Sequence, residues 1–313
     1  MTEFLKGCPP NANPLFGNFP MTLSIHLNNL WYQNDRLYGR WSPRSKVLLQ
    51  QFTKALGFTL KGLLSKSCTH LKGHGGIKAA VRQVQQRLDD YPYVARFDVA
   101  RYYASINHQT LLHILAELGI SAKQQASVET YLRLPDKHQS GCGLLAGGSL
   151  SPLLGAVYLS PLDNTMDKLM HTGRIYYCRF MDDFVILAKT RWHFRTAIAR
   201  LNASLNKLSL RLHSTKRFIG KTSKGFDFLG YHIHPGRRLR PSAESLRRFA
   251  QKFRRLYEHK ANTRTLWRYT KRWAQWLWGG LCGLVTTKGG EKYYFFSIAK
   301  RLGIKGLALS PLW

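Results

Sequence analysis

Acidic residues are scarce in this chain of 313 residues. It has 16 Asp and Glu against 48 Lys and Arg, which leaves a formal net charge of +32. Such a charge destabilises a compact fold through self-repulsion. A polyanionic partner that releases bound counterions on association explains best why this charge is tolerated. We therefore expect nucleic acid as the partner, in preference to a basic surface that serves solubility alone.

Paired cysteines and long hydrophobic runs are also missing. The five cysteines are widely spaced and none forms a C-x-x-C pair, which argues against a disulfide framework and a cysteine zinc site. Near the start, Glu3 and the pair Pro9–Pro10 replace the apolar run of a signal peptide. Residues 141–162 are uncharged and long enough to cross a bilayer, but glycines and prolines interrupt them. We therefore expect a cytoplasmic protein with no membrane partner.

Hydrophobic and charged residues are unevenly distributed along the chain. A hydrophobic content of 44%, with 12% aromatic residues, excludes a disordered basic tail. Residues 191–313 contain 27 basic and four acidic residues, whereas residues 1–190 contain 21 basic and 12 acidic residues. This asymmetry predicts two parts with different tasks, of which the first holds most carboxylates and the second presents a cationic surface.

Hydrophobic periodicity predicts a mixed α+β chain. A Met-Asp-Asp turn between two apolar runs is typical of a hairpin, and Asn107 and Ser121 are expected to cap helices. The expected helices cover residues 45–66, 77–88, 107–118, 121–134, 151–170, 194–208, 246–257 and 266–277, and the expected strands cover 94–99, 174–190 as a hairpin, 210–213 and 226–233.

Three aspartates stand in apolar surroundings. Asp98 lies inside an apolar strand, and Asp182 and Asp183 lie at the tip of the apolar hairpin. A charge in such a place is destabilising unless it is neutralised. A lone Asp-Asp pair is more often a turn or a cap, as we expect for Asp89 and Asp90. Three carboxylates from adjacent strands, however, suit two Mg²⁺ ions that catalyse phosphoryl transfer.

Four motifs, two of which contain these aspartates, resemble those of one family. In order they are FDVARYYASI at 97–106, GGSLSPLLGAVYLSPLD at 147–163, FMDDFVILA at 180–188 and GFDFLGYHI at 225–233. Their order and spacing resemble reverse transcriptases, specifically bacterial ones from group II introns, retrons, diversity-generating elements and antiphage defence systems. The resemblance extends from about Trp41 to Ile233.

The resemblance implies a fold, a domain order and an activity. The fold would be an α+β right-hand polymerase, with a palm of antiparallel sheet and helices, reduced fingers and a helical thumb. Residues 1–93 would form the N-terminal region and fingers, 94–235 the palm with some fingers elements interleaved, and 236–313 the basic thumb and C-terminal region. The activity would be that of an RNA-directed DNA polymerase, which is a nucleotidyltransferase.

The resemblance also assigns site residues. Asp98, Asp182 and Asp183 would be catalytic and would bind two Mg²⁺ ions, for which Mn²⁺ can substitute. The nucleotide would contact Val99, Tyr103, Gly147, Lys72, Arg82 and Lys216. The primer grip would consist of Leu229, Gly230 and Tyr231. The nucleic-acid backbone would contact Arg247, Arg248, Arg254, Arg255, Arg264 and Arg268.

Several of these assignments have simpler alternatives. An aromatic ring at Tyr103 would exclude a 2′-hydroxyl and select deoxynucleotides, but the ring can equally belong to the core. Lys72, Lys78 and Arg82 can hold a triphosphate, but they also fit a solvated helix face. Ala146 stands where relatives usually have Gln, so a polar contact to the nucleotide is expected to be missing.

The implied partners are an RNA template, deoxynucleotides and the DNA product. The small size and basic C-terminal region favour a dedicated non-coding RNA in an antiphage defence or retron-like system. A partner protein or a homo-oligomer stays open. Two alternatives also stay open: a group II intron-type maturase or RNA-binding splicing cofactor, and a polymerase of the same fold that makes RNA or needs no template.

Overall fold

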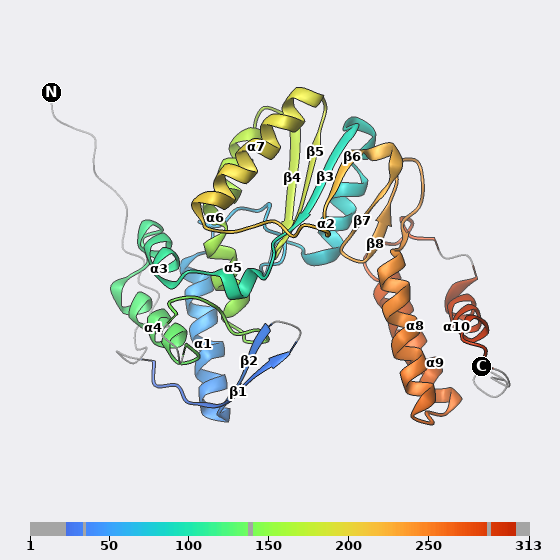
Figure 1. Ribbon diagram of the computed structural model, residues 1–313, viewed down its shortest axis with the longest axis horizontal. Helices are drawn as coiled ribbons and strands as arrows, with labels where there is room; N and C mark the ends of the chain where they lie inside the picture. The colour runs from blue at the N-terminus through green and yellow to red at the C-terminus, as the bar shows by residue number, and fades with distance from the viewer. Residues whose placement is uncertain (1–22, 34–35, 137–139, 287–288, 305–313) are drawn as a thin grey trace. The chain divides into compact units, whose positions relative to one another are not determined.

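A computed structural model describes residues 23–33, 36–136, 140–286 and 289–304 (Figure 1). The chain forms two compact units. Unit 1 combines the residues up to Leu64 with Tyr103–Tyr158, and unit 2 combines Ser65–Tyr102 with the residues from Leu159 onward. The α+β class is confirmed, whereas the division into fingers, palm and thumb stays a prediction.

Unit 1 is mainly helical and carries one β-hairpin. Its helices begin where polar side chains cap them: Ser42 before α1, Asn107 before α3 and Ser121 before α4. The hairpin was not expected from the sequence. The elements of this unit are β1 (Leu27–Gln33), β2 (Arg36–Trp41), α1 (Pro43–Thr59), α3 (His108–Glu117), α4 (Ala122–Arg133) and α5 (Ser151–Tyr158).

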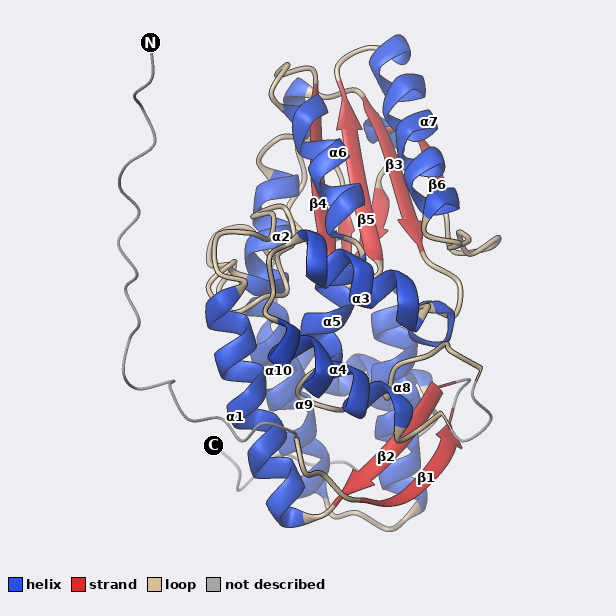
Figure 2. Ribbon diagram, turned by 90° about the vertical axis from the view of Figure 1, so that its left-hand side faces the viewer, coloured by secondary structure: helices blue, strands red, loops and turns tan. Residues whose placement is uncertain are grey.

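Unit 2 is built on an antiparallel sheet with the strand order β4-β5-β3-β6. Helices α6 and α7 lie against one face of this sheet and α2 lies against the other (Figure 2). The expected hairpin is confirmed as β4 and β5. The elements are α2 (Gly76–Gln85), β3 (Tyr93–Asp98), α6 (Ser160–Met170), β4 (Ile175–Phe180), β5 (Asp183–Ala188), α7 (Arg191–Lys207) and β6 (Phe218–Lys221).

Alternation along the strands divides the sheet residues between two cores. Val94, Val185 and Leu187 are buried in the cluster that contains Ala80 and Val84 of α2. Their neighbours in sequence point to the opposite face and are also buried, as expected of a sheet covered on both sides. Asp98 lies four residues after Val94, and Asp183 lies two residues before Val185. Their side chains therefore project on the same side of the sheet as these valines, the side that α2 covers.

Four expected elements differ from the structure. The strand expected at 226–233 is interrupted by a turn at Leu229 and Gly230 and forms a hairpin. The helix expected at 151–170 is two helices, because Pro161 in the first turn of α6 has no N–H to continue the preceding helix. The helix expected at 45–66 ends at Thr59. Residues 210–213 form no strand; Leu212 makes only an isolated bridge to Val99, and the edge strand is β6.

A small sheet and three helices complete unit 2. The sheet has the order β7-β8-β9, and α10 packs against α9. Phe249 of α8 stacks on Trp273 of α9 with ring centroids 4.4 Å apart, so the partly buried Trp273 packs against the core that contains Phe249. The elements are β7 (Phe226–Phe228), β8 (Tyr231–Ile233), β9 (Arg240–Pro241), α8 (Ala243–Glu258), α9 (Thr263–Trp278) and α10 (Gly290–Arg301).

Within the residues described above, none of the helices is both long and apolar enough to cross a bilayer.

Candidate active site

Two of the aspartates lie opposite each other on paired strands. The register of β3 and β5 pairs Asp98 directly with Asp183, and opposite residues of an antiparallel pair project on the same face. Asp182 lies in the turn between β4 and β5, and its carbonyl accepts a hydrogen bond from Val99 N at 3.3 Å. The structure therefore brings the three acids and Val99 to one end of the sheet.

The negative charge of this cluster is only partly compensated. Burial, followed by the charges of Asp98 and Asp182, raises the pKa of Asp183 to about 7. Lys216 opposes this effect; its Nζ lies 3.6 Å from Oδ2 of Asp98. The lysine side chain is 61% exposed, whereas Asp98 is 13% exposed. A bound cation would therefore stabilise the ionised cluster.

The three acids are suitable metal ligands, but they are not arranged as a complete coordination site. Among the described residues, no group of three or more His, Cys, Asp or Glu side chains is arranged as a metal site. Asp98 is engaged with Lys216. Carboxylate oxygens are nevertheless the donors that Mg²⁺ takes, and the charges of Asp98 and Asp182 add to burial in raising the pKa of Asp183.

A buried arginine and a half-buried histidine hold the turn that carries Asp182. Met181 has φ 57°, a left-handed conformation that is uncommon for a residue other than glycine. Its N–H donates to Nδ1 of His70 at 3.1 Å, and its carbonyl accepts from Nη1 of Arg179 at 2.8 Å. Arg179 in turn forms a buried ion pair with Asp163.

The sequence analysis missed the roles of His70, Asp163 and Arg179. A usable signal existed for two of them: Arg179 stands in an otherwise apolar strand, and Asp163 follows an apolar helix. Two opposite charges in apolar segments suggest a buried pair.

The predicted primer grip forms a tight hairpin. Leu229 and Gly230 connect β7 to β8, and both have positive φ, 48° and 87°, as a type I′ turn requires. A Cβ at Gly230 would lie 2.9 Å from the ring of Trp276 in α9. Tyr231 is buried, and its hydroxyl donates to the carbonyl of Leu277 at 2.8 Å. The hairpin is thus packed closely onto α9.

Two basic residues of α2 contact the C-terminal end of α9. Lys78 donates to the carbonyl of Trp276 and to the Tyr231 hydroxyl, and its Nζ lies 4.9 Å from the centroids of both rings. Arg82 donates to the carbonyl of Gly280. The last turn of α9 has no basic residue of its own, so these side chains satisfy carbonyls that a helix end leaves free. Burial lowers the pKa of Lys78 to about 8.

The proposed nucleotide contacts of the α2 region stay predictions. Lys72 lies exposed in the loop before α2, and the hydrogen bond of Arg82 does not test whether its guanidinium also binds phosphate. Two other candidates, Tyr103 and Gly147, belong to unit 1. Gly147 has φ 78°, and a Cβ there would lie 3.5 Å from the ring of Tyr38.

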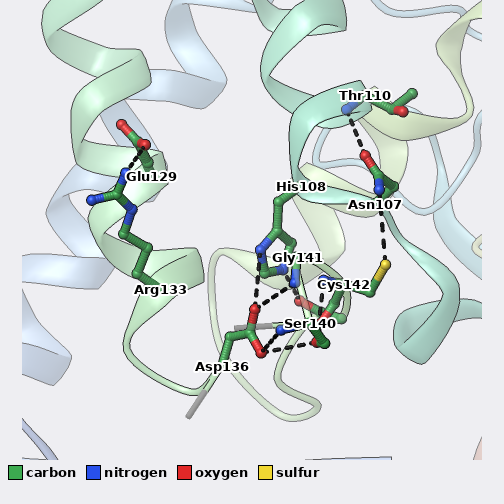
Figure 3. Close-up of polar contacts among 10 residues, drawn as sticks. Asn107, His108, Thr110, Glu129, Arg133, Asp136, Ser140, Gly141 and Cys142 are labelled. Atoms are coloured by element: carbon green, nitrogen blue, oxygen red, sulfur yellow. Dashed lines mark hydrogen bonds and ion pairs between the residues drawn. The ribbon is translucent and has the colours of Figure 1, made fainter. Parts of the chain in front are cut away.

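Polar contacts hold the loop that precedes Gly147 (Figure 3). Asp136 accepts hydrogen bonds from the backbone of Ser140 and Gly141, at 2.9 and 2.8 Å. Nε2 of His108 lies 2.8 Å from the carbonyl of Gly143. One residue further, Leu144 N donates to the carbonyl of Tyr103 at 2.9 Å. The segments that carry the two nucleotide candidates of unit 1 are therefore hydrogen-bonded to each other.

All six arginines predicted to bind the nucleic-acid backbone are exposed on α8 and α9. Arg247 and Arg248 pair with Glu244, and Arg254 pairs with Glu258. Such exposed pairs contribute little to stability and are screened by salt, so they leave the arginines accessible to phosphate.

Comparisons with known proteins agree with this architecture. Residues 40–233 match the family model described as reverse transcriptase (RNA-dependent DNA polymerase). No curated protein matches the sequence.

Among solved structures, the telomerase of Candida albicans in complex with a TWJ fragment of telomeric RNA is similar at a TM-score of 0.52 and 11% identity, covering 89% of this chain. The apo telomerase of Candida tropicalis is similar at a TM-score of 0.51 and 12% identity, covering 80% of this chain. The chain spans 59% and 51% of the lengths of these two proteins, and the likeness concerns the fold. With a family model that covers more than half of its length, the chain belongs to the reverse transcriptase (RNA-dependent DNA polymerase) family of nucleotidyltransferases.

Proposed function

We propose that this chain adds deoxynucleotides to a primer 3′ end on an RNA template. The observation that carries the proposal is the pairing of Asp98 with Asp183 across β3 and β5, with Asp182 in the adjoining turn. Family membership supports the same reaction. The +32 charge supports a nucleic-acid substrate.

The reaction depends on divalent cations, which the family generally uses. Asp98, Asp182 and Asp183 would hold two Mg²⁺ ions, or Mn²⁺ in their place. Bound there, the ions would stabilise charge on the attacking and leaving oxygens of the phosphoryl transfer. The protein's own contribution is to place three carboxylates at one end of a rigid sheet, with Lys216 close enough to compensate charge on Asp98.

The remaining site residues would position the substrates. Lys216, Lys72 and Arg82 would contact the triphosphate, and Val99 and Gly147 would approach the nucleotide through the backbone. Tyr103 would exclude a 2′-hydroxyl and so select deoxynucleotides. The hairpin turn at Leu229, Gly230 and Tyr231 would hold the primer end, and the exposed arginines of α8 and α9 would track the duplex backbone.

The template would be a dedicated non-coding RNA. The RNA in the structure of the Candida albicans telomerase supports RNA binding by this fold. We further propose a bacterial, cytoplasmic enzyme of an antiphage defence or retron-like system, because the motifs resemble those enzymes.

Primer extension tests the proposed reaction. The purified chain is incubated with an RNA template, a DNA primer, Mg²⁺ and either deoxynucleotides or ribonucleotides. We expect incorporation of deoxynucleotides, its loss in Asp182→Asn and Asp183→Asn, and its persistence in the surface control Asp89→Asn. Preferential incorporation of ribonucleotides, or activity that survives both catalytic substitutions, would overturn the proposal.

A further inference from the structure

We propose that Asp163 and Arg179 are positioning residues for the catalytic turn: together they hold the backbone of Met181 and thereby fix the direction of Asp182. The inference rests on the proposed polymerase function, since it assigns a role in aiming one of its catalytic carboxylates. Neither residue was a candidate site residue in the sequence, and neither touches the reacting atoms.

The first observation is the depth and completeness of the ion pair. Arg179 is 0% exposed and Asp163 is 1% exposed. Nε of Arg179 donates to Oδ1 of Asp163 at 2.8 Å, and Nη2 donates to Oδ2. The Tyr177 hydroxyl donates to Oδ1 at 2.8 Å. An arrangement with two parallel hydrogen bonds fixes the plane of the guanidinium as well as its position.

The second observation is the contact made by the third guanidinium nitrogen. Nη1 of Arg179 donates to the carbonyl of Met181 at 2.8 Å. The two nitrogens that bind Asp163 leave this one directed along the strand, toward the turn. Asp163 therefore acts on the turn indirectly: it holds the guanidinium so that one of its N–H groups reaches the residue before Asp182.

The third observation is that Met181 needs such support. Its φ of 57° lies in the left-handed region, which is unfavourable for a side chain with a Cβ. The N–H of Met181 is bound by His70 and its carbonyl by Arg179. Because both backbone polar groups of Met181 are bound by side chains, one from the half-buried His70 and one from the buried Arg179, the path of the chain into Asp182 and Asp183 is fixed.

The test compares variants that keep or remove the contact to Met181. Arg179→Lys keeps a positive charge beside Asp163 but lacks the planar fork that reaches Asp163 and Met181 at once. Tyr177→Phe is the matched control, since it removes one hydrogen bond to Asp163 and leaves the fork intact. If Arg179→Lys does not fold, the pair Asp163→Leu with Arg179→Met replaces it, because that pair leaves no buried charge without a partner.

Two measurements separate positioning from a merely structural role. For folded Arg179→Lys we expect kcat of primer extension to fall about 10- to 100-fold with KM for the nucleotide nearly unchanged. We expect a similar, about 10-fold or greater, loss of Mn²⁺ affinity measured by electron paramagnetic resonance without substrates. Tyr177→Phe should match the wild type in both. Wild-type kcat and Mn²⁺ affinity in a folded variant that lacks the Arg179 fork would overturn the proposal.

The Mn²⁺ measurement also keeps this inference distinct from the proposed function. A wild-type chain that binds Mn²⁺ but incorporates no nucleotide would refute the polymerase assignment, and the affinities of the variants would still decide whether Arg179 positions the turn.

Discussion

The substitution Asp183→Asn should abolish polymerisation and at the same time stabilise the metal-free protein at alkaline pH. Burial and the charges of Asp98 and Asp182 raise the pKa of Asp183 from 3.8 to about 7. Between these two values the folded chain holds a proton that the unfolded chain has lost. The free energy of unfolding therefore falls as the pH rises from about 4 to 7, and the full loss is reached above pH 7. Asparagine, which is uncharged and of similar shape, does not incur it.

The size of the effect follows from the same two pKa values. At about 1.4 kcal/mol per pKa unit, the raised pKa of Asp183 lowers the free energy of unfolding by about 4 kcal/mol at pH 8 and by about 2 kcal/mol at pH 5. We therefore expect Asp183→Asn to raise the free energy of unfolding by up to about these amounts. Urea unfolding at both pH values, followed by tryptophan fluorescence in the presence of a chelator, measures them.

Two controls keep this experiment specific. Asp89→Asn removes an exposed carboxylate and should change the free energy of unfolding by less than about 0.5 kcal/mol at either pH. Adding Mg²⁺ at pH 8 should stabilise the wild type, because an ion that binds only the folded state raises its stability, and it should stabilise Asp183→Asn less. If Asp183→Asn is no more stable than the wild type at pH 8, burial and the neighbouring charges do not penalise the Asp183 carboxylate as inferred.

Three further outcomes are expected. Gly230→Ala should lower the free energy of unfolding by about 2–4 kcal/mol, because the positive φ is unfavourable for alanine and its Cβ would meet Trp276. Gly236→Ala, which has a positive φ but open space around it, should lower the free energy of unfolding by only about 1 kcal/mol. Equal losses in urea unfolding would contradict the close packing of the hairpin on α9. Lys78 has a pKa of about 8 against an ordinary 10.5, so the folded chain loses this proton at a lower pH than the unfolded chain, and the free energy of unfolding should rise between about pH 8 and 10.5. This rise should vanish in Lys78→Met. If pH-dependent unfolding of Lys78→Met still shows the rise, Lys78 is solvated in the folded chain. Neutralising three exposed arginines of α8 and α9, Arg255, Arg264 and Arg268, should reduce the slope of log affinity for duplex against log salt by up to about three. An unchanged slope in a filter-binding titration would exclude these arginines from the interface.

The catalytic hairpin could be predicted from the sequence because every local signal agreed. Two apolar runs flank Asp182 and Asp183, and strands covered on both faces are expected to be continuously apolar. The helices with Asn107 and Ser121 as caps were predictable for a similar reason, since capping depends on neighbouring residues alone. The hairpin of β1 and β2 was missed because most of its residues are exposed, so that no burial pattern marks it.

Contacts between distant residues explain the other differences. Lys78 and Arg82 carry charges that the sequence shows, but their acceptors at the end of α9 lie 198 residues further along the chain. Asp163 and Arg179 lie within 16 residues of each other, yet their pairing depends on how α6 packs against β4. The sequence therefore shows which charged residues stand in apolar segments, but it does not show which partner each of them contacts in the fold.

These internal contacts change how the excess of basic residues is to be understood. Arg179 is fully buried against Asp163, Lys78 and Arg82 serve the end of α9, and Arg96 donates to the carbonyls of Lys216 and Asp227. Only Arg179 is paired with a carboxylate here, whereas Lys78, Arg82 and Arg96 donate to neutral groups and keep their charge. All four cations lie before residue 191, where the net charge is only +9. Because protein acceptors hold their side chains, we expect them to contribute less to counterion release than the exposed arginines of α8 and α9. We therefore expect a polyanionic duplex to bind along these two helices.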